Sequence, residues 1–383
     1  MKRNYIAKRF QNAGSGLTLD TEALAKYKDI IDLSIGDTDF ITDEGIINAA
    51  FRDAKAGYTR YGDPKGDPEL IDAVCRAWQE DFEQKLPHDH VLVSASSCLG
   101  MALVMFSILD PGDEVIVFSP YFPMYRTQIE LAGGVCVDVP TYASEDYAID
   151  EARLRAAITP RTKAIIFNNP TNPTGMAYGN DTLEMLARVA KEYDLLIAAD
   201  EIYTTYLYEG DFRPLRTLPG MAERTITLNS FSKNFLMTGW RVGVIIAEPE
   251  LLEVMNDING SLIYTAPSIS QRAAIHALSM RREIREKYVT AYRDRILYTA
   301  DRIEKIPYLS LVRPKGTFYL FPGIEKTGLT DDEFCNVLLD KAHVLVSHGK
   351  AFGTAGAGHF RIACTVGIDT LKIAFDRMEK LSF

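Results

Sequence analysis

Short apolar runs alternate with helical patterns between residues 90 and 250, and this alternation is typical of βαβ units. The runs are rich in valine, isoleucine and leucine, and each ends in turn residues. They lie at 113–120, 162–170, 194–201, 224–232 and 241–248. Nearly continuous apolar runs indicate strands that are covered on both faces. We therefore predict an α/β fold with a mainly parallel sheet that helices cover.

The pattern changes at about residue 281, where a long charged stretch predicts a helix that leaves the first domain. A smaller α+β unit follows, with apolar segments at 316–324, 343–347 and 359–366 and helices at 331–342 and 369–381. We predict a large domain at 40–282. The small domain is predicted to combine residues 1–39 with residues 283–383.

Composition narrows the class of protein. The chain has 383 residues, 47% hydrophobic and 25% charged, with 42 Lys and Arg against 52 Asp and Glu and a net charge of −10. This acidity argues against nucleic acid or an anionic membrane surface as a partner. No apolar run approaches the roughly 20 residues of a membrane span, and no export signal is visible. Five scattered cysteines favour reduced thiols over disulfides or a zinc site. We expect a cytoplasmic protein without a metal.

The stretch "SFSKNFLMTGWRVG" at 230–243 allows two chemistries. A Ser-x-x-Lys run can hold a serine nucleophile, which also needs Ser-x-Asn or Tyr-x-Asn and then Lys-Thr-Gly downstream. Lys326, Thr327 and Gly328 are present, but the middle motif is absent between Lys233 and Lys326. The alternative is a lysine that holds a cofactor, and the position of Lys233 directly after a predicted strand favours it.

Polar and aromatic residues follow the predicted strands and should meet at one edge of the sheet, because ligands of such sheets bind beyond the carboxyl ends of the strands. These residues are Phe122, Asn172, Asp200, Tyr203 and Lys233. Pyridoxal phosphate, a flat aromatic aldehyde with a pyridine nitrogen, a phenolic oxygen and a phosphate, needs all of these groups. The set therefore predicts a pyridoxal phosphate site.

Each of these residues has a predicted part in that site. Lys233 would bond to the aldehyde carbon, and Asp200 would pair with the ring nitrogen and keep it protonated. Asn172 and Tyr203 would donate hydrogen bonds to the ring oxygen and favour its ionised form. Phe122 would cover one face of the ring as an offset stack.

The phosphate also has predicted donors. The segment "SASSCLGMAL" at 94–103 leads from a strand into a helix, so the backbone N–H groups around Ser97 and Cys98 form an anion site. Ser230, Ser232 and Arg241 would complete it, the arginine by a charge-assisted contact.

Eight motifs in order along the chain resemble those of the class I/II aminotransferases, which are fold-type I pyridoxal phosphate enzymes of the aspartate aminotransferase superfamily. They are "YTRYGDPKGDPEL" (58–70), "LDPGDEV" (109–115), "SPYFPMY" (119–125), "NNPTNPTG" (168–175), "ADEIY" (199–203), "SFSKNFLMTGWRVG" (230–243), "KGTFYLFP" (315–322) and "HFRIACT" (359–365). The resemblance covers nearly all of the chain. It implies a seven-stranded type of sheet and a catalytic set of Lys233, Asp200 and Tyr203.

The resemblance also implies residues that bind the substrate. Arg361 would clamp the α-carboxylate with its planar fork, with Gly36 and Asn172 beside it. Tyr61 would reach the phosphate of the neighbouring subunit, so that the working unit is a homodimer. The chain departs from the family pattern at Cys98, whose side chain is a weak donor, and at His348, where a proline is usual. His348 is either a residue of the substrate pocket or a solvated surface histidine.

The reaction that the resemblance implies is ping-pong transfer of an amino group from an L-amino acid to a 2-oxo acid. A carbon–sulfur β-lyase on the same scaffold, using the same lysine, stays open as the alternative. For the donor, a pocket near Leu17, Phe40, Tyr121 and Tyr264 favours a neutral or aromatic amino acid, with 2-oxoglutarate as the acceptor. Basic residues near the N-terminus leave acidic donors open.

Overall fold

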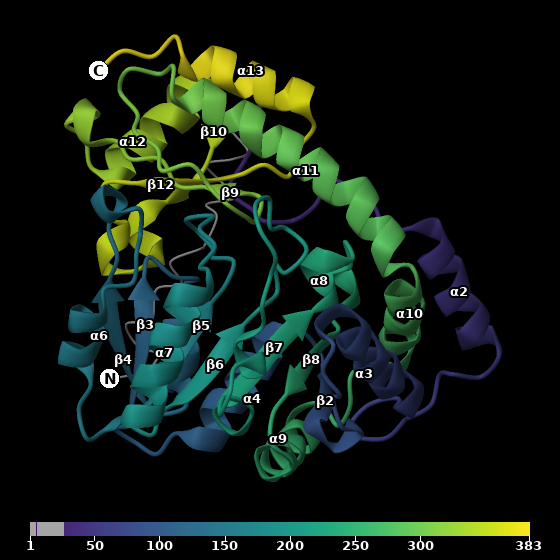
Figure 1. Cartoon of the computed structure of the whole chain (residues 1–383). Coiled ribbons are helices and arrows are strands. Elements are labelled where there is room, and N and C mark those ends of the chain that lie inside the picture. The colour runs from purple at the N-terminus through teal and green to yellow at the C-terminus, as the bar shows by residue number, and fades with distance from the viewer. Residues whose placement is uncertain (1–4, 6–26) are drawn as a thin grey trace.

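A seven-stranded sheet forms the centre of the larger part of the molecule (Figure 1). The structure, a computed structural model, describes residue 5 and residues 27–383. Across the sheet the strands run in the order β2 (Val91–Ser94), β8 (Gly243–Ile246), β7 (Thr225–Ser230), β6 (Leu196–Asp200), β5 (Thr162–Asn168), β3 (Glu114–Ser119) and β4 (Val135–Pro140). The predicted α/β fold with a mainly parallel sheet is confirmed.

One predicted strand runs against the others. Neighbouring strands from β4 to β7 are parallel, whereas β8 is antiparallel to both β7 and β2. A parallel return needs a long crossover, usually through a helix that spans the sheet. Only the four-residue helix α8 (Phe231–Asn234) and a 3₁₀ turn separate β7 from β8, so the chain reverses its direction instead.

Helices cover both faces of the sheet, as the apolar runs predict. On β3, Val115 and Val117 pack on the face that α4 (Ser97–Ile108) and α9 (Pro249–Leu262) cover. Ile116 points to the opposite face, against α7 (Asn180–Glu192). The other helices of this part are α2 (Glu44–Lys55), α3 (Pro68–Phe82), α5 (Met124–Leu131), α6 (Glu151–Ala157) and α10 (Ser268–Ser279).

The smaller part lies above the carboxyl ends of the parallel strands in Figure 1. Its three-stranded sheet has the order β11 (Ser347–His348), β12 (Phe360–Ala363) and β9 (Tyr319–Leu320), and β1 (Ile31–Asp32) pairs in parallel with β10 (Val344–Leu345). Helices α12 (Asp331–Val337) and α13 (Ile368–Met378) pack around it, and a π-helical turn at Leu338–Ala342 continues α12. The predicted segment 343–347 is thus divided between two sheets.

The long helix α11 (Arg281–Ile303) joins the two parts. Its first half places Ile284 and Tyr288 in the hydrophobic cluster of the larger part, and its second half places Ile296 and Ile303 in the cluster of the smaller part. We propose domain boundaries at 40–282 and at 1–39 with 283–383, of which residues 1–4 and 6–26 lie outside the described residues. Among the described helices, none combines the length and apolar character needed to cross a membrane.

Candidate active site

A cavity of about 660 Å³ opens at the carboxyl ends of the parallel strands and extends to β11 and β12. Every residue predicted to bind the cofactor or the α-carboxylate lines it, with the exception of Tyr61. These residues are Gly36, Ser97, Cys98, Phe122, Asn172, Asp200, Tyr203, Ser230, Ser232, Lys233, Arg241 and Arg361. Residues that are far apart in the sequence are thus brought to one place.

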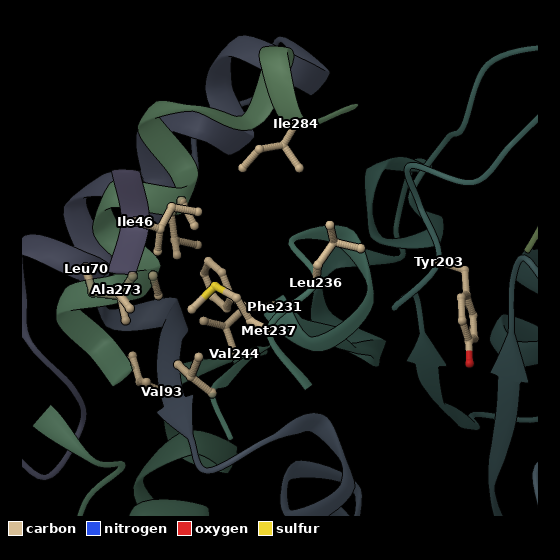
Figure 2. Close-up of a cluster of buried hydrophobic side chains, with 14 of the residues drawn as sticks. Ile46, Leu70, Val93, Tyr203, Phe231, Leu236, Met237, Val244, Ala273 and Ile284 are labelled. Carbon is tan, nitrogen blue, oxygen red and sulfur yellow. The ribbon is translucent and has the colours of Figure 1, made fainter. Parts of the chain in front are cut away.

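The helix that carries Lys233 is anchored by its neighbours in the chain. Phe231, Leu236 and Met237 are buried in a hydrophobic cluster that also contains Val244 of β8 (Figure 2). Burial of these flanking side chains fixes α8 against the end of β7. Lys233 itself is half-buried, and its Nζ donates to the carbonyl oxygen of Gly36 at 2.5 Å. Its amine therefore lies in the cavity at the position predicted to bind substrate.

Asp200 ends strand β6, and its carboxyl group is buried in the cavity wall. Oδ2 accepts a hydrogen bond from the hydroxyl of Tyr125. Oδ1 is buried and has no hydrogen-bond partner. Burial raises the pKa of Asp200 to about 6, and the bond from Tyr125 opposes that rise. A buried oxygen without a partner is costly, so Oδ1 is suited to a ligand that brings a proton donor.

The start of α4 lies at the cavity, where the sequence predicts a cradle for the phosphate. Ser96 caps the helix with a φ of 90°, and the first backbone N–H groups of a helix lack partners within it. Gly243 of β8 lies against this turn, and a Cβ atom there would come within 2.7 Å of the Ser97 nitrogen. Arg241 lies beside the cradle, with Nη1 3.5 Å from Ser232 Oγ. The strand and the loop therefore meet so closely that only glycine fits at this position.

Arg361 lies on the opposite side of the cavity. Its Nη1 donates to Asn172 Oδ1 at 2.9 Å and its Nη2 to the carbonyl oxygen of Ser34 at 2.5 Å. The guanidinium lies 4.5 Å from the centre of the Tyr319 ring, and Nε is buried without a partner. Burial lowers the pKa of Arg361, because no carboxylate accompanies the charge among these contacts. The Arg361 guanidinium is therefore suited to bind an anionic ligand.

Two tyrosines of the cavity wall have no predicted role. Tyr319 places its hydroxyl 3.1 Å from that of Tyr203, and Tyr125 meets Phe122 edge-on with ring centres 5.6 Å apart. Both lie inside quoted motifs, "KGTFYLFP" and "SPYFPMY". For Tyr125, the available signal was its place three residues after Phe122, at the start of the helix that follows β3.

Tyr61 is 84% exposed and its ring meets that of Tyr264 at 5.0 Å, outside the cavity of its own chain. Phe40 and Tyr121 also lie outside the set of described residues that line the cavity. Leu17 lies outside the described residues. The donor pocket predicted from Leu17, Phe40, Tyr121 and Tyr264 is therefore not formed by the three of them that the structure describes. Other aromatic side chains line the cavity.

His348 borders the cavity at the edge of β11. Its Nδ1 lies 2.8 Å from Asp332 Oδ1, and Lys350 binds the other oxygen of the same carboxylate. The imidazole is thus held through one nitrogen. The sequence left two positions open for His348, in the substrate pocket or in solvent, and the side chain lies between them, partly exposed at the edge of the cavity.

These features fit pyridoxal phosphate as the cofactor. A lysine amine, an unpartnered carboxylate oxygen and a helix start with an adjacent arginine surround one cavity, as a ring aldehyde, a pyridine nitrogen and a phosphate require. The fold and the site thus define a class, the pyridoxal phosphate enzymes built on a mainly parallel α/β sheet.

The chain belongs to the family described as aminotransferase class I and II, whose profile matches residues 28–378. It is 36% identical to an aspartate aminotransferase of Pyrococcus abyssi, over 93% of this chain and 92% of the relative. Aromatic-amino-acid aminotransferase 2 of Thermococcus litoralis is also 36% identical, over 92% and 91%. The solved structure of Thermus thermophilus aspartate aminotransferase with maleate superposes with a TM-score of 0.92 and 32% identity, over 99% of this chain and 100% of that one. The protein is an aminotransferase, and pyridoxal phosphate is the cofactor of the family, as predicted.

Proposed function

We propose that this aminotransferase moves the amino group of an L-amino acid to a 2-oxo acid in two half-reactions that share one site. The observation that carries the proposal is the arrangement of Lys233, Asp200 Oδ1 and Arg361 around a single cavity. An amine that can move a proton, an acceptor for a ring nitrogen and a fork for a carboxylate all line this cavity.

Each side chain has a distinct proposed task. Pyridoxal phosphate, when bound, supplies an aldehyde that holds the amino group and a ring that draws electrons from Cα. Lys233 Nζ holds the aldehyde in the resting enzyme and moves the proton from Cα of the substrate. Asp200 Oδ1 would accept a hydrogen bond from the ring nitrogen. Asn172 and Tyr203 would bind the ring oxygen, and Phe122 would cover the ring.

The anionic groups are bound at the two ends of the cavity. Ser230, Ser232 and Arg241, with the N–H groups of Ser97 and Cys98, would bind the phosphate. Arg361 would bind the α-carboxylate, beside Gly36 and Asn172, and the unpartnered Nε is one atom left for it.

We further propose a neutral or aromatic donor with 2-oxoglutarate as the acceptor. The described lysines and arginines that line the cavity are Lys233, Arg241 and Arg361, and each has a task in binding the cofactor or the α-carboxylate. Among the described lining residues, no lysine or arginine is left for a distal carboxylate. The names of the relatives do not choose the donor, because they include both aspartate and aromatic amino acids.

The proposed working unit is a homodimer in which Tyr61 reaches the phosphate of the partner's site. Its exposed position outside the cavity of its own chain supports this role. We also propose a cytoplasmic location, supported by five cysteines that are all free.

A panel of L-amino acids with 2-oxoglutarate, monitored for glutamate, tests the reaction and the donor. We expect glutamate to form fastest from a neutral or aromatic donor. Fastest formation from aspartate would overturn the donor class but not the reaction.

A parallel assay for pyruvate and sulfide from cysteine or cystathionine tests the lyase alternative. The relatives reported above are named aminotransferases and give this alternative no support. Pyruvate and sulfide without glutamate in the first assay would replace the proposed reaction by β-elimination.

A further inference from the structure

We propose that Tyr125 is a positioning residue for the cofactor: its hydroxyl holds Asp200 Oδ2 and leaves Oδ1 as the oxygen that meets the ring nitrogen. The inference rests on the proposed role of Asp200 in binding pyridoxal phosphate. It assigns a task to a residue that neither the motif pattern nor the family resemblance singled out.

The two oxygens of Asp200 are unequal before any ligand binds. Tyr125, in α5, is 3% exposed and donates its hydroxyl to Oδ2, while Oδ1 is buried without a partner. A carboxylate can accept at both oxygens, and a single fixed donor fills one of them. The geometry therefore selects the oxygen that remains for a ring N–H, and it holds the plane of the carboxylate.

The hydrogen bond also has a defined direction. Burial, with Asp200 nearby, raises the pKa of Tyr125 well above its ordinary value, so the phenol keeps its proton and acts as the donor. Burial raises the pKa of Asp200 to about 6, and the bond from Tyr125 opposes that rise. Removing the hydroxyl should therefore make Asp200 easier to protonate near neutral pH. A protonated carboxyl could no longer keep the ring nitrogen protonated.

The segment around α5 touches three sides of the same site. Phe122, just before the helix, lies edge-on to the Tyr125 ring at 78°. Gln128, one turn after Tyr125, donates from Nε2 to the carbonyl oxygen of Cys98 at 2.8 Å. The residue that holds Asp200 thus also contacts the side chain proposed to cover the ring, and its helix is bonded to the start of α4. A displaced Tyr125 would disturb the ring nitrogen first.

The test compares Tyr125→Phe, Asp200→Asn and the double variant, with Tyr308→Phe as a matched control. Tyr308 also has a buried hydroxyl that donates to a backbone carbonyl, but it lies in the cluster of the smaller part. The measurements are the affinity of each apoenzyme for pyridoxal phosphate and the pH midpoint of the visible absorbance of the bound cofactor. Without the hydroxyl, Asp200 is easier to protonate and its plane is not held, so Tyr125→Phe should weaken binding by about tenfold, the equivalent of one unit in the pKa of Asp200, and shift the midpoint. In the Asp200→Asn background the same change should have little further effect.

Two outcomes overturn the inference alone: affinity and midpoint in Tyr125→Phe equal to those of the control, or the same loss in the Asp200→Asn background as in the wild type. Unchanged binding and absorbance in Asp200→Asn would instead contradict the proposed site, and the inference with it. Folding of each variant is checked by its thermal transition.

Discussion

The two walls of the cavity differ in how the chain builds them. The cofactor wall consists of residues at or just beyond the ends of strands of the large sheet or at the start of α4, among them Ser97, Asp200 and Lys233. The substrate wall consists of residues from the smaller part and from the segment before α2, among them Ser34, Arg361 and His348. The backbone of each of these residues is placed by the strand or helix to which it belongs, although distant residues such as Tyr125 hold the side chains. The second wall depends on pairings between distant segments, such as Ser347 with Arg361 and Ile31 with Val344.

The walls also differ in what they leave unsatisfied. The cofactor wall includes Asp200 Oδ1 and Gln128 Oε1 as unpartnered acceptors, and the substrate wall includes Arg361 Nε as an unpartnered donor. Asp200 Oδ1 can accept a hydrogen bond from a ring N–H, and the Arg361 guanidinium can bind a carboxylate. The two walls together therefore suit a ligand that has a ring N–H at one end and a carboxylate at the other. Variants of the two walls should therefore separate cofactor binding from substrate binding.

Lys233→Ala should have the largest effect. Without its amine we expect kcat to fall by about 10⁴-fold, the upper range for a positioned proton-transfer group. The cofactor should still bind without a covalent bond, since Asp200, Ser230 and Arg241 remain. The check is turnover together with borohydride labelling, which should attach the cofactor to the Lys233 peptide in the wild type only. Lys326→Ala is the control, and it should behave as the wild type. Residual activity of Lys233→Ala within about tenfold would remove this lysine from proton transfer.

Arg361→Lys tests the substrate wall. A point-charge ammonium cannot reproduce a planar fork on a carboxylate, so KM should rise for every donor, by about tenfold or more. Cofactor affinity should change much less than KM, because Arg361 meets the cofactor wall only through its bond to Asn172 Oδ1. Steady-state kinetics and a cofactor titration of the same preparation provide the comparison, with the exposed Arg313→Lys as control. Equal KM values would show that another group holds the α-carboxylate.

Tyr61→Phe tests the proposed contribution of the partner subunit to the cofactor wall. Loss of one hydroxyl bond to the phosphate should weaken cofactor binding by about tenfold, in the range of a bond to a charged group. Tyr142→Phe, another exposed tyrosine, serves as the control. Light scattering on the wild type accompanies the titration, and a fully active monomer would exclude a role across subunits.

Glu201→Gln should affect stability alone. Glu201 follows Asp200 but accepts from the Leu215 backbone N–H at 3.0 Å, and burial raises its pKa from 4.5 to about 8. The folded state thus keeps a proton that the unfolded chain releases, and stability from this group is lost as pH rises from about 4.5 through 8. The glutamine variant should match the wild type near pH 4.5 and be more stable at pH 9 by up to about 5 kcal/mol, since each unit of pKa difference corresponds to about 1.4 kcal/mol. Denaturant unfolding of both proteins at pH 4.5 and pH 9 tests this expectation. A variant that is less stable than the wild type at pH 9 would contradict the raised pKa of Glu201 in the folded state.

Much of the cofactor wall could be predicted because its signals are local. Lys233 and Asp200 each follow an apolar run, and parallel strands bring their carboxyl ends to one edge whatever lies between them. The reversed direction of β8 was not predicted, since apolar composition reports burial and not direction. The short connection through α8 decided the direction of β8.

The sequence by itself determined the class of fold, the cofactor and the edge of the sheet at which the site forms, because periodicity and strand-end residues act over a few positions. Only the tertiary structure decided that Tyr125 holds Asp200, that Arg361 lies over Tyr319, and that Phe40 and Tyr121 lie outside the cavity wall. Such contacts join side chains from elements far apart in the chain. Their partners depend on how those elements pack, and no local pattern records that packing.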